Sequence, residues 1–365
     1  MNRQEHVLLA PFTTIGVGGE ARFFVEARSI EDVIEAFDFA RTHAVPVHVL
    51  GGGSNVVFAD AGFDGLVLLM RLPDNTSGQD GDSVSVTAGA GVALDELVSW
   101  AIAHGFAGLE CLSGIPGTVG GAVVANSGAY GAQCSDTFVS AEVLDTAGTT
   151  PVARVFKKEE CDFSYHDSVF ARARGRYVVL RATFLLRAGE ASRPDYKDYR
   201  FNLSERVPAD GGELKLDAIR TAILDTREQK GALIRPGRRS YKSAGSFFRM
   251  PYVSAEEHEK IAAAARTLDA EKEERLRPWA WEQPDGSYKL APGFLLEYTE
   301  FQKGYARGAV GISPMHTLSI INVAGARALE IAQLARDMQD AVENIFGVRL
   351  EREVEYVGDV ETSDE

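Results

Sequence analysis

Two glycine-rich blocks constrain the fold of this chain more than any other feature of its sequence. The first is GGGSN at residues 51–55, which lies between two short apolar runs, and the second is SGIPGTVGGAVVANSGAYG at residues 113–131. Glycine adopts positive φ angles and lets another backbone or a ligand approach closely. The second block is therefore expected to be neither a regular helix nor a long strand, and both blocks are candidate functional loops.

Apolar periodicity divides the rest of the chain into short strands and helices. Apolar residues that recur at i, i+3 and i+4 predict a helix, and alternation or a short apolar run predicts a strand. The predicted helices cover 31–44, 92–104, 213–230, 254–266 and 327–346; the predicted strands cover 45–50, 56–58, 65–70, 83–88, 140–145, 152–156, 177–187, a region around 305–323, and 349–357.

The length of the chain, 365 residues, allows two or three domains, since one domain takes roughly 150 residues. Residues 188–212 are polar and rich in turn-forming residues, and long loops of this kind are often functional. We place the main domain boundary in this segment.

Composition narrows the class of protein. The chain carries 38 Lys and Arg against 53 Asp and Glu, a net charge of −15, so it is a poor candidate for wrapping nucleic acid. The three cysteines, Cys111, Cys134 and Cys161, provide neither a disulfide framework nor a metal-binding spacing. The N-terminus lacks the apolar stretch of a signal peptide, and no apolar run approaches ~18 residues. These features predict a cytoplasmic protein without a metal site.

The first glycine-rich block can bind phosphate. Its consecutive glycines expose amide groups that can surround a pyrophosphate, and Ser54 and Asn55 add side-chain donors. The block matches neither the GxGxxG fingerprint nor the P-loop pattern. A plain turn is the alternative.

The second block strengthens the phosphate hypothesis. Its six glycines leave amides bare, while Asn126, Ser127 and Tyr130 supply polar groups. Two such loops in one domain suit a long dinucleotide such as FAD. The alternative is a buried glycine corner that packs a helix on a sheet.

Three further places could carry chemistry. Ser246 follows a glycine, precedes two phenylalanines and has basic neighbours in Lys242 and Arg249, although a strand entering an aromatic core explains the same pattern. Glu353 and Glu351 alternate on the predicted C-terminal strand, which places both on one face. Of the histidines, His166 and His316 lie in motif-like segments, but a lone histidine is more often structural.

Six segments of the chain follow one another in a recognisable order: TIGVGG (14–19), LGGGSN (50–55), GLECLSGIPGTVGGAVVANSGAYG (108–131), ECDFSY (160–165), AGSFF (244–248) and FGVRLEREVEYVG (346–358). Together they resemble the UDP-N-acetylenolpyruvoylglucosamine reductase family, the flavoenzymes of peptidoglycan precursor synthesis. The resemblance extends from about residue 8 to residue 358.

This resemblance implies an α+β fold, with a vanillyl-alcohol-oxidase/PCMH-type FAD-binding domain of two subdomains plus a C-terminal α+β substrate-binding domain. The implied FAD-binding domain is 1–212, with subdomains at about 1–75 and 76–212. The implied remainder is a substrate-binding domain at 213–330, a helix and strand at 331–358 that complete the active site, and an acidic tail at 359–365.

The resemblance also implies the reaction. NADPH reduces non-covalently bound FAD, and the flavin passes hydride to the enolpyruvyl ether of UDP-N-acetylglucosamine enolpyruvate. Ser246 then protonates the neighbouring carbon, and Glu353 stabilises the enol form of the carboxylate. The expected partner is this nucleotide sugar, not nucleic acid or a membrane, and the expected state is a monomer or weak oligomer.

Site residues follow from the family motifs. The implied cofactor contacts are Gly51, Gly52, Gly53, Ser54, Asn55, Gly114, Ile115, Pro116, Gly117, Gly120, Gly121, Asn126, Gly128, Tyr130 and Gly131. The implied substrate contacts are Tyr165, Tyr196, Arg227, Lys230, Lys303 and His316.

The chain departs from the family at one catalytic position. After Tyr165 the family typically carries arginine, and here His166 stands in its place. We expect His166 to act as imidazolium, with Glu353 raising its pKa, because the developing enolate needs a cation. The alternatives are another FAD-dependent oxidoreductase of the same superfamily, such as a sugar or hydroxy-acid oxidase, and a non-catalytic flavin- or nucleotide-sugar-binding protein.

Overall fold

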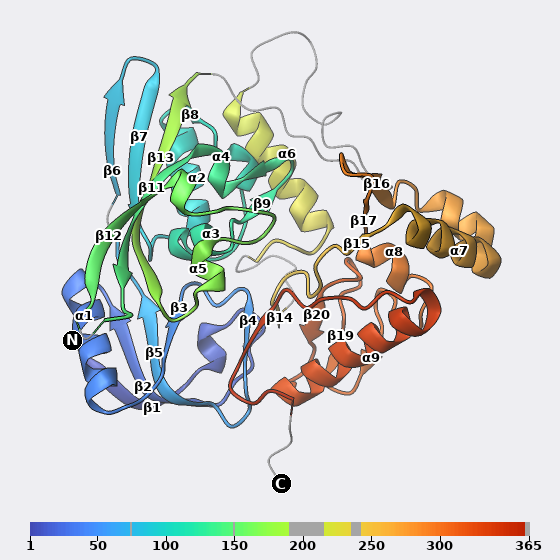
Figure 1. Cartoon of the computed structure of the whole chain (residues 1–365), viewed down its shortest axis with the longest axis horizontal. Helices are drawn as coiled ribbons and strands as arrows, with labels where there is room; N and C mark the ends of the chain where they lie inside the picture. The colour runs from blue at the N-terminus through green and yellow to red at the C-terminus, as the bar shows by residue number, and fades with distance from the viewer. Residues whose placement is uncertain (74, 149, 190–214, 235–241, 362–365) are drawn as a thin grey trace.

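The computed structural model describes residues 1–73, 75–148, 150–189, 215–234 and 242–361 (Figure 1). The candidate Tyr196 and nearly all of the predicted boundary segment lie outside the described residues. Two sheet-containing regions built from the N-terminal half lie on one side of the molecule, and the C-terminal half forms the other side.

The N-terminal region is a four-stranded sheet covered by one helix. Helix α1 (Ile30–Thr42) begins at a capping box in which Ser29 and Asp32 bond each other's backbone amides, and it buries Val33 and Phe37. The amphipathic period predicted this helix to within two residues at each end. The spatial order of the strands is β1 (Arg3–Leu8), β2 (Glu20–Ala27), β5 (Phe63–Met70) and β3 (Val47–Leu50).

The second region is a larger antiparallel sheet packed against helices. Its core joins that of the first region, so one apolar cluster runs beneath both sheets. The strands, in spatial order, are β12 (Val152–Lys157), β11 (Phe138–Asp145), β13 (Tyr177–Ala188), β7 (Ser83–Gly89) and β6 (Asn75–Asp80), with β8 (Phe106–Ala107) beside β13. The covering helices are α2 (Leu94–Ala103), α3 (Val119–Val124), α4 (Cys134–Thr137), α5 (Val169–Arg172) and α6 (Leu216–Gln229).

The C-terminal half forms two small sheets around three helices. Its core also takes in Ile15 and Val57 from the N-terminal half, so the two halves share buried surface. One sheet has the order β14 (Lys242–Ser243), β20 (Ile320–Asn322), β19 (Val310–Ile312) and β18 (Ala306–Arg307). The other has the order β15 (Tyr252–Val253), β17 (Tyr288–Leu290) and β16 (Ala280–Glu282); the helices are α7 (Ala255–Arg275), α8 (Pro292–Leu296) and α9 (Ala328–Phe346).

The end of the chain returns to the N-terminal half. Strand β21 (Glu355–Val357) pairs in parallel with β4 (Val56–Phe58), directly after the first glycine-rich block. Asp60 accepts hydrogen bonds from the first amides of α9, at 2.8 Å from Ala328 and 3.1 Å from Leu329. These contacts hold the C-terminal segment beside the first glycine-rich block.

Three expectations about local structure were wrong. Residues 349–354 are not a strand, because only Arg352 forms a bridge, with Phe248, before β21 begins. The second glycine-rich block contains a six-residue helix, α3, whose N-cap is Thr118. Helix α7 runs nine residues beyond its predicted end and has a kink at Asp269.

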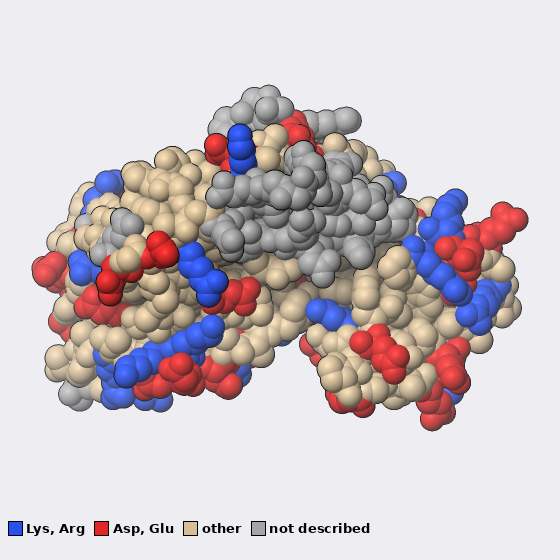
Figure 2. Space-filling model, turned by 90° about the horizontal axis from the view of Figure 1, so that it is seen from above, with Lys and Arg blue, Asp and Glu red and all other residues tan. Residues whose placement is uncertain are grey.

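On the face in Figure 2, Lys and Arg are interspersed with Asp and Glu and form no continuous basic band among the described residues. No helix in the described part of the chain is both long and apolar enough to span a bilayer.

Candidate active site

The two glycine-rich blocks lie against each other. A Cβ on Gly52 would stand 2.5 Å from the Cα of Gly117, and a Cβ on Gly51 would stand 2.8 Å from the hydroxyl of Thr118. The hydroxyl of Ser54 donates to the carbonyl of Pro116 at 3.4 Å. Only glycine permits this approach of backbone to backbone, so the two predicted loops form a single structural unit.

The first block keeps its amide groups available. Among the described residues, the amides of Gly52, Gly53 and Ser54 donate to no backbone or side-chain acceptor. Successive free amides in a turn form a concavity that binds anions. The free amides of the first block therefore provide a site that suits the pyrophosphate of a dinucleotide.

Some glycines of the second block pack tightly against neighbouring residues, and others are exposed. A Cβ on Gly120 would stand 2.8 Å from the Cβ of Ala90, and one on Gly114 would stand 2.8 Å from Leu224 of α6. At these positions the glycine-corner alternative holds. Gly121 is exposed and has nothing closer than 3.7 Å to its Cβ position, and Ile115 and Pro116 are half-buried beside the first block.

The hairpin that ends the second block is tied to helix α6. Gly128 pairs with Gln133, and Gly131 turns the chain with a φ of 85°. Tyr130 is only 6 % exposed and packs with Ile219 and Ile223 of α6. Its side chain therefore anchors the hairpin.

Two asparagines connect the glycine-rich blocks to the predicted catalytic residues. The side-chain amide of Asn55 donates to the carbonyl of Glu353 at 3.3 Å. The side chain of Asn126 donates to the carbonyl of Ser164 at 2.8 Å and accepts from the amide of Ser135 at 3.0 Å. Both were predicted to contact the cofactor, yet their side chains hold the segments that carry Glu353 and His166.

His166 and Glu353 form a close pair. The Nδ1 of His166 is 3.4 Å from a carboxyl oxygen of Glu353, and the two side chains are 23 % and 21 % exposed. Burial raises the pKa of Glu353 to about 7, although the nearby Arg249 opposes that shift. His166 has a φ of 50°, which is uncommon outside glycine, so the turn holds it in place.

The expectation that His166 is an imidazolium was wrong. Burial, together with the positive charges of Lys289 and Arg249, lowers the pKa of His166 to about 4, the opposite of the rise expected from Glu353. The raised pKa of Glu353 favours its neutral form below about pH 7, so in mildly acidic solution the pair is largely uncharged. Because His166 is then neutral, a developing negative charge must be met by another group.

Tyr165 contacts both His166 and Lys289, a residue of the C-terminal half. The ammonium of Lys289 lies 3.4 Å from the centre of the Tyr165 ring, and this ring lies edge-on to His166 with centroids 4.4 Å apart. Burial raises the pKa of the Tyr165 phenol. Sequence reasoning missed Lys289, because a lysine on a short polar hairpin carries no pattern of its own.

The residue after Ser246, Phe247, pairs with Glu353 through the backbone. The amide of Glu353 donates to the carbonyl of Phe247 at 2.9 Å, while the amide of Phe247 donates to the carbonyl of Leu318, also at 2.9 Å. Phe247 is fully buried, so the aromatic-core interpretation also holds. The Ser246 side chain itself is exposed and makes no hydrogen bond to a described residue, which leaves it available to a ligand.

Apart from Tyr165, the predicted substrate contacts that the structure describes come from two parts of the chain, the end of α6 and residues 303–316. Lys303 pairs with Glu297 at 3.5 Å, and the Nδ1 of His316 accepts from the amide of Leu318 at 3.2 Å. His316 thus supports the loop that carries Ser246. At the end of α6, Arg227 lies against Gly114 and Lys230 is buried.

Two parts of the chain match known protein families. Residues 21–153 match the family described as FAD binding domain. Residues 236–357 match the family described as UDP-N-acetylenolpyruvoylglucosamine reductase, C-terminal domain. The predicted fold class, a flavoprotein-type domain followed by a second α+β domain, is confirmed.

Similar proteins match over nearly their full length. The UDP-N-acetylenolpyruvoylglucosamine reductase of Thermobifida fusca is 36 % identical over 356 residues, which cover 97 % of both chains. The protein of the same name from Pseudomonas aeruginosa is 36 % identical over 96 % of this chain and 97 % of its own. The crystal structure of UDP-N-acetylenolpyruvylglucosamine reductase from Thermus caldophilus superposes with a TM-score of 0.62 at 26 % identity, covering 98 % of each chain.

Proposed function

Because this chain belongs to the UDP-N-acetylenolpyruvoylglucosamine reductase family, we propose that it reduces UDP-N-acetylenolpyruvoylglucosamine to UDP-N-acetylmuramate. NADPH is the hydride donor, FAD is the bound cofactor, and the reaction serves peptidoglycan precursor synthesis. The observation that supports this most strongly is the Glu353–His166 pair, which two asparagines attach to the two glycine-rich blocks.

The chain offers a binding site for the cofactor. The amides of Gly52, Gly53 and Ser54 would bind its pyrophosphate, and the exposed Gly121 would allow close approach of another part. Bound FAD, once reduced, supplies the hydride for the enolpyruvyl double bond. The family match at residues 21–153 supports the same cofactor.

Residues of the chain are proposed to donate the proton to the substrate and to stabilise the negative charge on its carboxylate. Hydride addition leaves an electron pair on the carbon beside the substrate carboxylate, and that carbon must then be protonated. Ser246, exposed and without a partner among the described residues, is the proposed proton donor. Glu353 in its neutral form can donate a hydrogen bond to the carboxylate, because its pKa lies near 7. His166 is the proposed neutral partner that orients Glu353.

The nucleotide part of the substrate is assigned to residues farther along the chain. Arg227, Lys230, Lys303 and His316 are the proposed contacts, together with Tyr196, which lies outside the described residues. We place the FAD-binding domain at 1–212, the substrate-binding domain at 213–330 and the completing segment at 331–358. The protein is proposed to be a cytoplasmic monomer or weak oligomer.

A half-reaction experiment tests the proposal. The purified yellow protein should release free FAD on denaturation, and it should oxidise NADPH faster when UDP-N-acetylenolpyruvoylglucosamine is present. Ser246→Ala should leave reduction of the flavin by NADPH intact and slow its reoxidation by substrate by about 10²–10⁴-fold. Covalently attached flavin, or reoxidation by oxygen alone, would instead indicate an oxidase; flavin without turnover would indicate a binding protein.

A further inference from the structure

Arg249 carries a positive charge that the described residues leave uncompensated. Its Nε is buried and has no hydrogen-bond acceptor. Within the described part of the chain, its guanidinium forms no ion pair. Arg249 as a whole is half-buried, and a cation partly removed from water without an anion costs free energy that a bound anion would compensate.

The backbone fixes Arg249 next to the catalytic pair. Its amide donates to the carbonyl of Glu351 at 2.9 Å, within the same pairing that joins Phe247 to Glu353. Its charge acts on the carboxyl of Glu353 and on the ring of His166, lowering the pKa of both groups. Arg249 is also three residues after Ser246, the proposed proton donor.

Neighbouring cations already have partners. Arg352 contacts Glu361 at 3.1 Å and lies over the ring of Tyr356 at 3.5 Å. Arg174 pairs with Glu355 at 2.6 Å. Lys289 lies on the ring of Tyr165, and burial lowers its pKa. Among these four cations, Arg249 is the one whose side chain forms no ion pair or ring contact with a described residue.

We propose that Arg249 binds the carboxylate of the enolpyruvyl group and stabilises the negative charge that develops there. This inference rests on the proposed function. When hydride adds to the terminal carbon, the electron pair of the double bond moves toward the carboxylate, and a proton then adds to the carbon beside it. A planar guanidinium can bind both carboxylate oxygens throughout, because it stays protonated at every accessible pH.

A binding experiment isolates this role from turnover. Oxidised holoenzyme is titrated calorimetrically, without NADPH, with UDP-N-acetylenolpyruvoylglucosamine and with UDP-N-acetylglucosamine, which lacks the carboxylate. Arg249→Met should weaken binding of the first ligand by at least about 30-fold, since one partner of a buried charge pair is removed. Affinity for the second ligand should change less than about twofold. Arg307→Met, at a surface arginine paired with Asp337, is the matched control and should change neither affinity.

Each other outcome is decisive. Equal weakening for both ligands, or none for either, would overturn the assignment of Arg249 while leaving the proposed function in place. Failure of the wild-type protein to bind the enolpyruvate would instead overturn the proposed function. If Arg249→Met loses flavin or unfolds, Arg249→Lys decides in the same titration: it keeps the charge but loses the planar fork, so a selective loss of about tenfold supports the proposal and no selective loss contradicts it.

Discussion

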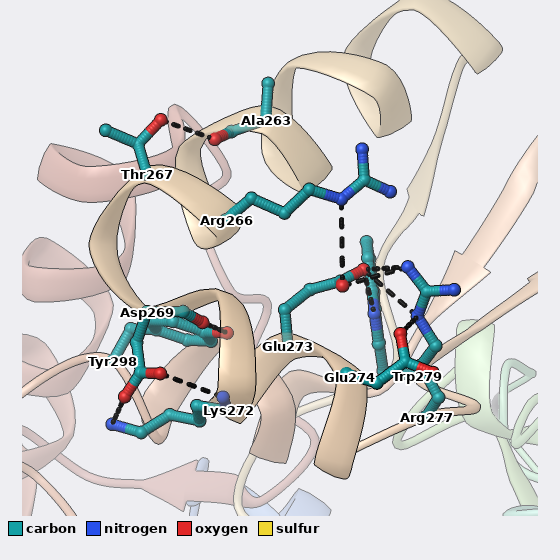
Figure 3. A network of polar contacts seen from close by, with 10 residues as sticks. All are labelled: Ala263, Arg266, Thr267, Asp269, Lys272, Glu273, Glu274, Arg277, Trp279 and Tyr298. Atoms are coloured by element: carbon teal, nitrogen blue, oxygen red, sulfur yellow. Dashed lines mark hydrogen bonds and ion pairs between the residues drawn. The ribbon is translucent and has the colours of Figure 1, made fainter.

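The C-terminal half of the chain holds one buried glutamate, Glu273, and one half-buried glutamate, Glu353, whose surroundings are opposite. Glu273, on α7, is 3 % exposed and accepts hydrogen bonds from Arg277 at 2.7 to 3.2 Å and from the indole of Trp279 at 3.4 Å (Figure 3). Glu353 is 21 % exposed, and within the described residues only His166 lies within ion-pair distance, at 3.4 Å.

This difference separates a structural charge from a functional one. The carboxylate of Glu273 has its anionic form satisfied on both oxygens, and in return it raises the pKa of Arg277. The carboxyl of Glu353 lacks such donors, so burial moves its pKa to about 7, where it exchanges protons readily. The number of hydrogen-bond donors around a glutamate, and not its burial alone, therefore indicates whether its carboxylate is a structural charge or a group that exchanges protons.

The largest expected effect is the loss of activity in Glu353→Gln. The substrate half-reaction should slow by roughly 10²–10⁴-fold, because the group that meets the substrate carboxylate loses its acidic proton. Reduction of the flavin by NADPH should be unchanged, and stopped-flow absorbance separates the two steps. Thermal stability should hold or increase. A variant that is both active and unstable would place Glu353 in the same class as Glu273.

The opposite result is expected for Glu273→Ala, which should lower the unfolding free energy and leave the catalytic rate unchanged. Removal of the carboxylate leaves Arg277 and the indole of Trp279 without their acceptor, and such a break typically costs about 3–5 kcal/mol of unfolding free energy. Urea unfolding measures the cost. Glu274→Ala is the matched control on the same helix, since Glu274 is 74 % exposed, and it should change stability by less than about 0.5 kcal/mol. Turnover per folded molecule should be normal in both variants.

The pH dependence of stability should reveal the neutral Glu353–His166 pair. The raised pKa of Glu353 contributes stability that is present below about pH 4.5 and is lost as pH rises through 7. The lowered pKa of His166 contributes stability that is present above about pH 6.5 and is lost as pH falls through 4. Between these limits the folded pair and the unfolded pair hold the same number of protons, so the two contributions should largely cancel in the wild type.

Single variants should uncover each contribution. His166→Gln should lose stability as pH rises from 4.5 to 7, and Glu353→Gln should lose it as pH falls from 6.5 to 4, each by about 2–3 kcal/mol. The charge of Arg249 acts on both groups, and the charge of Lys289 acts on His166. Denaturant midpoints at several pH values measure the slopes. Parallel profiles for all three proteins would show that the pair is ionised in the folded state.

The smallest effect is expected at the edge of the Glu273 cluster. The Nε of Arg266 lies 3.7 Å from Glu273, but its side chain is 56 % exposed (Figure 3). Exposed ion pairs contribute about 0–1 kcal/mol, so Arg266→Gln should lower the unfolding free energy by no more than that. A loss as large as that of Glu273→Ala would mean that Arg266, and not Arg277, provides the main compensation.

Local sequence determined much of this protein. Helix α1 follows from an apolar stripe and a capping box, and strands such as β7 and β11 follow from apolar alternation, because these patterns act over a few residues. Strand β1, almost wholly exposed, was not predicted, since only pairing with β2 defines it. The two glycine-rich blocks were found for the same local reason: several glycines in a row allow few regular structures.

Tertiary structure decided the chemistry of the site. The sequence placed Ser246, Glu353 and His166 among the candidates, but their protonation depends on burial and on charges from distant segments. Burial of His166, and the charges of Lys289 and Arg249 beside it, arise only in the folded chain, and together they lower its pKa where Glu353 alone would raise it. Similarly, the folded chain shows that the side chains of Asn55 and Asn126 bond the segments that carry Glu353 and His166. Electrostatic environment and hydrogen-bond partners are properties of the folded chain, because residues far apart in sequence create them.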